Sequence, residues 1–87
     1  MRTHTILHTF INRHGKLESD INCGFNGASD EDARNVFDSH VRFAEDAWLT
    51  GDTWNGTPIR ITAIMLVDAN DKVLGEWHHE PAMAGAA

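Results

Sequence analysis

The chain has 87 residues, 41% of them apolar, and its 13 acidic and seven basic side chains give a formal net charge of −6. This length supports one small domain, and the apolar content argues against a disordered chain. The acidic balance disfavours direct binding to nucleic acid or to an anionic membrane, because phosphate groups are held by clustered Lys and Arg, and it favours protein partners that have a basic surface.

Two strands joined by a short turn are expected at the start of the chain. Residues 3–12 contain no Gly or Pro, and Gly15 follows them at a position where a positive φ would close a hairpin. Residues 16–25 alternate more cleanly, which predicts a strand with one buried and one solvent-exposed face. The face predicted to be buried consists of Leu17, Ser19, Ile21, Cys23 and Phe25.

One long helix is predicted over residues 29–50. Ser29 is placed to cap its start, acidic residues in the first turn favour the positive end of the helix dipole, and Gly51 can end it. Apolar residues at three- and four-residue steps predict a stripe that packs on a sheet. We interpret His40, within that stripe, as a core-edge histidine bonded to a hydroxyl or carbonyl, with its pKa lowered by burial. The predicted stripe is Ala33, Val36, Phe37, His40, Ala44, Ala47 and Trp48.

The rest of the chain predicts a second pair of strands. Residues 52–57 form a polar loop that holds Trp54. Residues 58–67 and 72–79 have the composition of strands, and the polar sequence between them predicts a turn. The predicted order of elements is therefore strand, strand, helix, strand, strand.

The predicted fold class is α+β with ββαββ order, in which one helix packs on a four-stranded, mainly antiparallel sheet. Residues 1–80 form this single domain, and residues 81–87 are expected to be a flexible C-terminal tail. The single cysteine excludes an internal disulfide, which fits a reducing compartment. With no apolar signal or membrane-length segment, the expected location is cytoplasmic, meaning the host cytoplasm if a phage encodes the chain.

The third predicted strand is apolar on both faces, although one helix can cover only one face of the sheet. Some of Ile64, Leu66 and Leu74 are therefore expected to lie exposed on the uncovered side. An exposed apolar patch often marks a binding surface, so Ile64 and Leu66 are candidate contacts. The alternative is a central strand with scattered apolar surface residues, which is common in monomers.

No catalytic, metal-binding or cofactor-binding motif stands out in the sequence. Cys23 and His40 are the one nucleophile and base that both fall on predicted core faces, where a buried thiol without positive neighbours is inert. The six histidines lack the spacing of a metal site. We therefore expect no enzymatic activity, no metal and no cofactor.

The outward face of the predicted helix is a candidate binding surface. It carries Asp38, Arg42, Glu45 and Asp46. Arg42 and Asp46 have the four-residue spacing of a helical ion pair, as do Arg34 and Asp38. The face is either a solvated helix surface or an acidic surface that docks on a basic protein, in which case Trp54 is a further candidate contact.

The order of these elements resembles that of small phage and mobile-element inhibitors, including some anti-CRISPR proteins. The resemblance covers the strand at residues 16–25, the Asn26-Gly27 turn and the helical run ASDEDARNVFDSHVRFAEDAW. It implies an inhibitor that binds a host nucleic-acid-handling complex, for example a CRISPR effector complex, and blocks it. HicB-like antitoxin domains have a similar strand–strand–helix order and are a less favoured alternative.

A second hypothesis is self-association. A homodimer formed through the sheet would give the domain a structural or regulatory role. The sequence leaves this hypothesis open beside the inhibitor hypothesis.

Overall fold

The computed structural model describes residues 2–79, and the predicted tail of residues 81–87 lies outside them. The elements are β1 (Arg2–Ile11), β2 (Leu17–Asn26), α1 (Asp30–Thr50), β3 (Thr53–Trp54), β4 (Thr57–Pro58), β5 (Ile61–Asp68) and β6 (Val73–His78). Four strands form an antiparallel sheet in the order β2-β1-β5-β6, and β3 pairs with β4 in a separate ribbon. The predicted α+β class and its ββαββ order are confirmed, with the ribbon as an addition.

The ends of α1 are fixed by the residues that the sequence indicates. The Ser29 hydroxyl accepts a hydrogen bond from the backbone N–H of Asp32 at 3.1 Å, which satisfies one of the free donors of the first turn. At the other end, Gly51 adopts the left-handed conformation, with φ 68°, and its N–H donates to the Ala47 carbonyl at 2.9 Å. The helix therefore has defined ends and a fixed length against the sheet.

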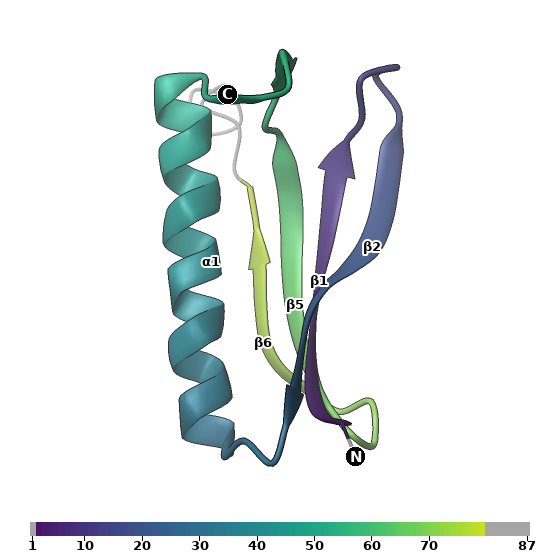
Figure 1. Cartoon of the computed structure of the whole chain (residues 1–87), viewed down its shortest axis with the longest axis vertical. Helices are drawn as coiled ribbons and strands as arrows, with labels where there is room; N and C mark the ends of the chain where they lie inside the picture. The colour runs from purple at the N-terminus through teal and green to yellow at the C-terminus, as the bar shows by residue number, and fades with distance from the viewer. Residues whose placement is uncertain (1, 80–87) are drawn as a thin grey trace, which may run out of the picture.

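The helix lies on one face of the sheet, mainly over β5 and β6 (Figure 1). Its buried residues pack against Ile6 of β1 and against Ile61, Ile64 and Leu66 of β5. Gly75 of β6 leaves space for the helix, because a Cβ there would lie only 3.0 Å from the Phe37 ring. The core is thus centred under β5, and β2 lies at the edge farthest from the helix.

An irregularity in β2 overturns the predicted buried face of that strand. Ile6 pairs with Cys23, but the next residue, Leu7, pairs with Ile21, so Asn22 is an extra residue in β2. A bulge reverses the alternation of side chains along a strand. Cys23 and Phe25 lie on the helix side as predicted, whereas Leu17, Ser19 and Ile21 lie on the opposite side and are exposed.

The expectation that Ile64 and Leu66 lie exposed is also wrong. Both side chains are on the helix side of the central strand β5, with Ile64 1% and Leu66 0% exposed. They pair with His8 and Ile6 of β1, which are buried on the same side. The uncovered side of β5 carries Ala63, Met65 and Val67 instead.

The helix is too polar to cross a membrane. In the described part of the chain, no helix combines the length and apolar character of a membrane span.

Candidate protein-binding site

The outward face of α1 presents the acidic residues that the sequence singles out. Asp38, Arg42, Glu45 and Asp46 are all exposed. The predicted helical ion pairs do not form within residues 2–79, where the pairs closer than 4 Å are His4–Asp30 and His78–Glu76. Arg42 instead donates to the Ser39 hydroxyl at 3.4 Å. The three carboxylates on this face are therefore unpaired within the described residues and open to a partner.

Trp54 projects from the β3–β4 ribbon with 73% of its surface exposed. The turn between these strands is Asn55-Gly56, and both residues have a positive φ, of 52° and 81°. Positive φ at both central positions is the requirement of a type I′ turn, for which Asn-Gly is the preferred sequence. The tight turn holds the indole at the end of the molecule where α1 finishes.

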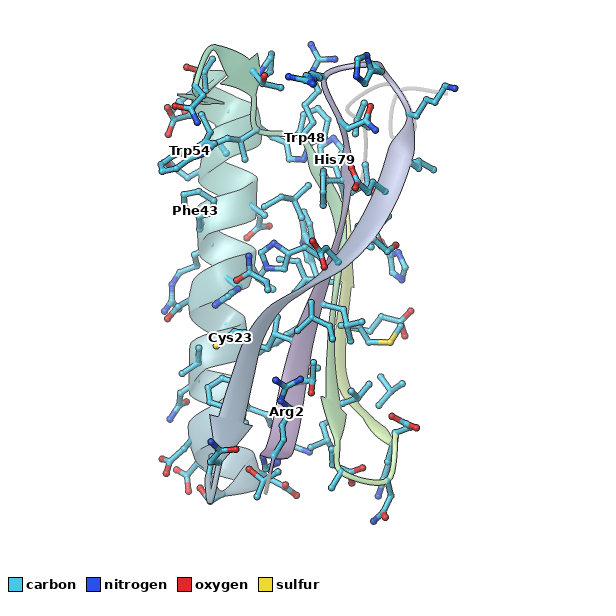
Figure 2. All side chains as sticks on the ribbon, turned by 45° about the vertical axis from the view of Figure 1, so that its right-hand side comes forward. Arg2, Cys23, Phe43, Trp48, Trp54 and His79 are labelled. Carbon is cyan, nitrogen blue, oxygen red and sulfur yellow. The ribbon has the colours of Figure 1, made fainter. Side chains whose placement is uncertain are left out.

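Phe43 lies beside Trp54 on the flank of the helix (Figure 2). It is 49% exposed, because it lies just outside the apolar stripe that packs on the sheet. Both aromatic side chains line the same open cleft of about 890 Å³. Two large aromatic side chains left in water beside one hollow are typical of a binding site, since Trp and Phe bury much apolar area on contact.

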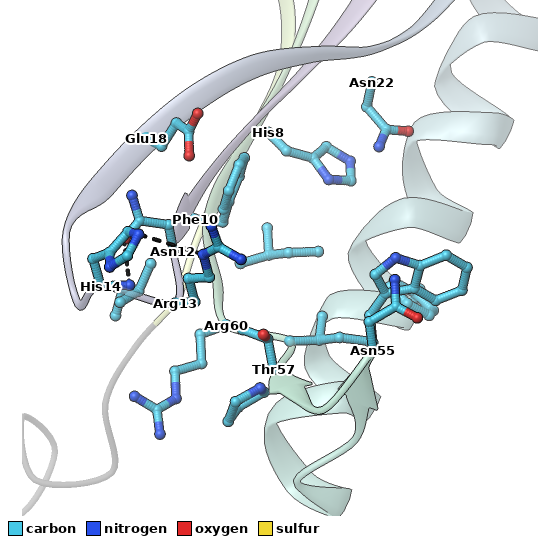
Figure 3. A pocket seen from close by; sticks show the side chains of 16 residues that line it. His8, Phe10, Asn12, Arg13, His14, Glu18, Asn22, Asn55, Thr57 and Arg60 are labelled. Atoms are coloured by element: carbon cyan, nitrogen blue, oxygen red, sulfur yellow. Dashed lines mark hydrogen bonds between the residues drawn. The ribbon is translucent and has the colours of Figure 1, made fainter.

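The cleft exists because the helix does not cover the whole sheet. Since α1 packs over β5 and β6, the helix side of the β1–β2 hairpin stays open toward solvent. Phe10 of β1, Glu18 of β2 and the bulged Asn22 form one wall, and the β3–β4 ribbon forms the opposite wall (Figure 3).

The charge of the cleft is opposite to that of the helix face. Arg13, His14 and Arg60 line it, against the single carboxylate of Glu18 among its described residues. Arg13 contacts the His14 ring at 3.3 Å, and within residues 2–79 neither arginine has a carboxylate within 4 Å. The surface therefore changes from acidic on α1, through the aromatic pair of Phe43 and Trp54, to basic at the β1–β2 turn.

A pair of histidines borders the cleft between β1 and α1. His8 Nε2 lies 2.9 Å from His40 Nδ1, so the predicted hydroxyl or carbonyl partner of His40 is replaced by a ring nitrogen. Burial, helped by the neighbouring His40, lowers the pKa of His8 to about 4, and burial also lowers the pKa of His40, in the predicted direction. The two rings are neutral near pH 7 and hold β1 and α1 together through one shared proton.

Cys23 is not brought into a catalytic pair. It is partly buried against the core, and His40 is bonded to His8 rather than to the thiol. Among residues 2–79, no three His, Cys, Asp or Glu side chains come together as metal ligands.

The sequence pointed to part of this site. It indicated Trp54 and the acidic helix residues, but not Phe43, Arg13 or Arg60. Phe43 could have been found as the one aromatic residue of the helix outside its apolar stripe. The Asn55-Gly56 dipeptide was the available signal for the ribbon that positions Trp54.

No protein-family model, curated protein or solved structure matches this chain.

Proposed function

We propose that this protein is a non-enzymatic protein-binding module that inhibits a host nucleic-acid-handling complex, as phage-type inhibitors such as anti-CRISPR proteins do. Its partner is a protein with a basic surface, for example a CRISPR effector complex. The observation that carries the proposal is the exposed aromatic pair, Phe43 and Trp54, beside an acidic helix face whose carboxylates are unpaired within residues 2–79.

The aromatic pair supplies the anchor of the proposed contact. Buried Trp and other aromatic residues dominate the binding energy of many protein interfaces. The cleft beneath Phe43 and Trp54 is wide enough to accept an apolar side chain from the partner. A partner seated here would dehydrate both rings, which are largely in water in the free protein.

The charged groups around this anchor orient the partner and increase the rate of association. Asp38, Glu45 and Asp46 would attract Lys and Arg side chains that otherwise hold nucleic acid, and this attraction depends on salt concentration. Arg13 and Arg60, on the other side of the aromatic pair, would repel the same basic residues. The change of charge across the site therefore favours a single orientation of the partner.

The test is a binding measurement between the protein and a panel of purified, guide-loaded CRISPR effector complexes. Trp54→Ala should weaken binding at least about tenfold, as expected for an interface anchor. The triple variant Asp38→Lys, Glu45→Lys, Asp46→Lys should weaken binding by a similar factor and flatten its dependence on salt between about 50 and 300 mM.

Asp71→Lys is the matched control for charge. It reverses an exposed carboxylate in the turn between β5 and β6, which does not line the cleft, and should change affinity less than about twofold. If no complex in the panel binds, or if the triple variant binds with unchanged affinity and salt dependence, the proposed partner class is wrong.

A further inference from the structure

The face of the sheet opposite the helix is apolar and has nothing packed on it among the described residues. Side chains directly opposite each other in paired strands share a face, so the register defines this surface. Leu7 pairs with Ile21 and Met65, while Thr5 pairs with Val67, which pairs with Val73. We call these and their neighbours the back face; its apolar residues are Leu7, Ile11, Leu17, Ile21, Ala63, Met65, Val67 and Val73.

The back face lies on the side of the sheet away from α1 (Figure 1). Ile21 is 53% and Val73 46% exposed, and Leu17 is more exposed still. Threonine and serine fill the positions between the aliphatic side chains, and Thr9 and Ser19 bond to each other at 2.9 Å. The aliphatic side chains on this face are of the kind that interdigitate when one sheet packs on another.

The back face carries few charges, in a chain with a net charge of −6. One of them is Arg2, whose side chain lies against Gly24, the partner of Thr5 on this face. Among the acidic residues within 2–79, the register places only Glu76 on this face, opposite Met65 and at the edge strand β6. The Glu76 carboxylate is bonded to the His78 ring at 2.7 Å. Two copies of an acidic protein meet more readily where acidic side chains are few, and within residues 2–79 this face carries one.

We propose that the back face binds a second copy of this chain and forms a face-to-face, twofold-symmetric dimer. Four strands about 4.8 Å apart and about 25 Å long cover on the order of 500 Å². Two copies would bury on the order of 1,000 Å² in total, which is the lower end of the range for specific interfaces. The expected dimer is therefore reversible, with a dissociation constant of roughly micromolar order.

The arrangement also keeps the acidic helices apart. Packed layers are separated by about 10 Å, so two sheets between two helices place the helices roughly 30 Å from each other. This distance exceeds the Debye length of about 8–10 Å at physiological salt, so repulsion between the helices is screened. Phe43 and Trp54 remain accessible on both copies, and the dimer does not compete with the partner of the proposed function.

The test is sedimentation velocity of the full chain at about 5 and about 200 µM. The weight-average mass of the natural protein should rise from 9.7 kDa toward twice that value. The double variant Ile21→Asp, Val73→Asp should remain monomeric at both concentrations, because it places a carboxylate on each edge strand of the interface, β2 and β6. Both residues are exposed in a single copy, so the variant should keep its fold, which circular dichroism checks.

Leu49→Asp is the control, since it places a charge at an exposed apolar residue of α1 outside the back face. It should dimerise as the natural protein does, and so should the triple charge-reversal variant of the helix. A natural protein that stays monomeric at the higher concentration overturns the proposal. Undiminished dimerisation of the Ile21→Asp, Val73→Asp variant overturns it as well, because the contact would then lie elsewhere, for example at the edge of β2.

Discussion

His8 Nε2 and His40 Nδ1 face each other at 2.9 Å, with the ring centroids 5.1 Å apart in an edge-to-face arrangement. Two facing nitrogens can form a hydrogen bond only if one carries a proton and the other does not. A second proton between them would add repulsion to the cost of burying a charge. The neutral histidine pair therefore stabilises the folded chain, whereas a protonated pair destabilises it.

Stability should fall as the pH drops from 6.5 toward 4. The pKa of His8 is lowered from 6.5 to about 4 in the folded chain, so between these values the unfolded chain binds more protons than the folded chain. The free energy of unfolding is thus at its full value above pH 6.5 and decreases below it, by up to ~3 kcal/mol from His8. Urea unfolding at about pH 7.5 and about pH 4.5 measures the change.

His8→Gln is the control for this pH dependence. Glutamine can keep a hydrogen bond to His40 but does not titrate, so the variant should lose less stability on acidification. Carboxylates titrate in both proteins, and their contribution cancels in the comparison. Equal losses in the two proteins would show that His8 is protonated as easily in the folded chain as in the unfolded one.

A second histidine, His4, joins β1 to the first turn of α1. Its Nε2 donates to Asp30 Oδ1 at 2.8 Å, and its Nδ1 lies 3.0 Å from Thr3 Oγ1. The ring is 4% exposed whereas the Asp30 side chain is 62% exposed. His4→Ala should therefore cost about 2–3 kcal/mol, because it leaves a cavity beneath the helix start.

Asp30→Ala should cost only about 1 kcal/mol, since water can replace an exposed carboxylate and the loss at the helix dipole is small. Thermal unfolding of the two variants gives the comparison. Equal losses of stability would mean that the hydrogen bond to Asp30, rather than burial of the His4 ring, stabilises this corner.

Gly75 of β6 lies directly against the Phe37 ring of the helix. A Cβ on residue 75 would lie 3.0–3.3 Å from three atoms of the Phe37 ring, which is itself buried. Gly75→Ala should therefore destabilise the protein by about 1–2 kcal/mol through overpacking. In the background of Phe37→Leu the same change should cost less, and a double-mutant cycle measures the difference.

Gly24→Ala is the matched control. A Cβ there would approach the Arg2 side chain at 2.6 Å, closer than at Gly75. However, Arg2 is exposed and flexible and can move aside, so the cost should be below about 0.5 kcal/mol. A larger cost for Gly24→Ala than for Gly75→Ala would contradict the assignment of Phe37 as the rigid partner.

The fold class could be predicted from the sequence because its strongest signals are local. Ser29 and Gly51 define the helix by their own backbone and side-chain chemistry, without help from distant residues. The Asn55-Gly56 turn is a signal of the same local kind, and its positive φ angles explain a ribbon in what was predicted to be a loop. Such features depend on a few neighbouring residues.

The faces of the strands could not be predicted, because they depend on pairing between distant residues. The bulge at Asn22 reverses the alternation within β2, and nothing in that polar residue distinguishes it from its neighbours. In β5 both faces are apolar, so the sequence could not tell the face that α1 covers from the uncovered one. The candidate site was affected in the same way, since Ile64 and Leu66 proved to be buried.

The reversal within β2 gives the most direct test of the strand faces. Leu66→Ala removes a fully buried side chain and should cost about 3 kcal/mol through lost burial and a residual cavity. Leu17→Ala should cost less than about 0.5 kcal/mol in the monomer, because Leu17 lies on the back face, in water. The measurement is urea unfolding at about 1 µM protein, where self-association is weak.

The same Leu17→Ala variant should weaken the dimer when the sedimentation experiment is repeated at high concentration. The bulge at Asn22 implies that the Leu17 side chain contributes to the dimer but not to the stability of the monomer. A cost of several kcal/mol for Leu17→Ala at low concentration would instead place Leu17 in the core. The alternation of β2 would then run unbroken from Leu17 to Phe25, and the back face would lose one edge.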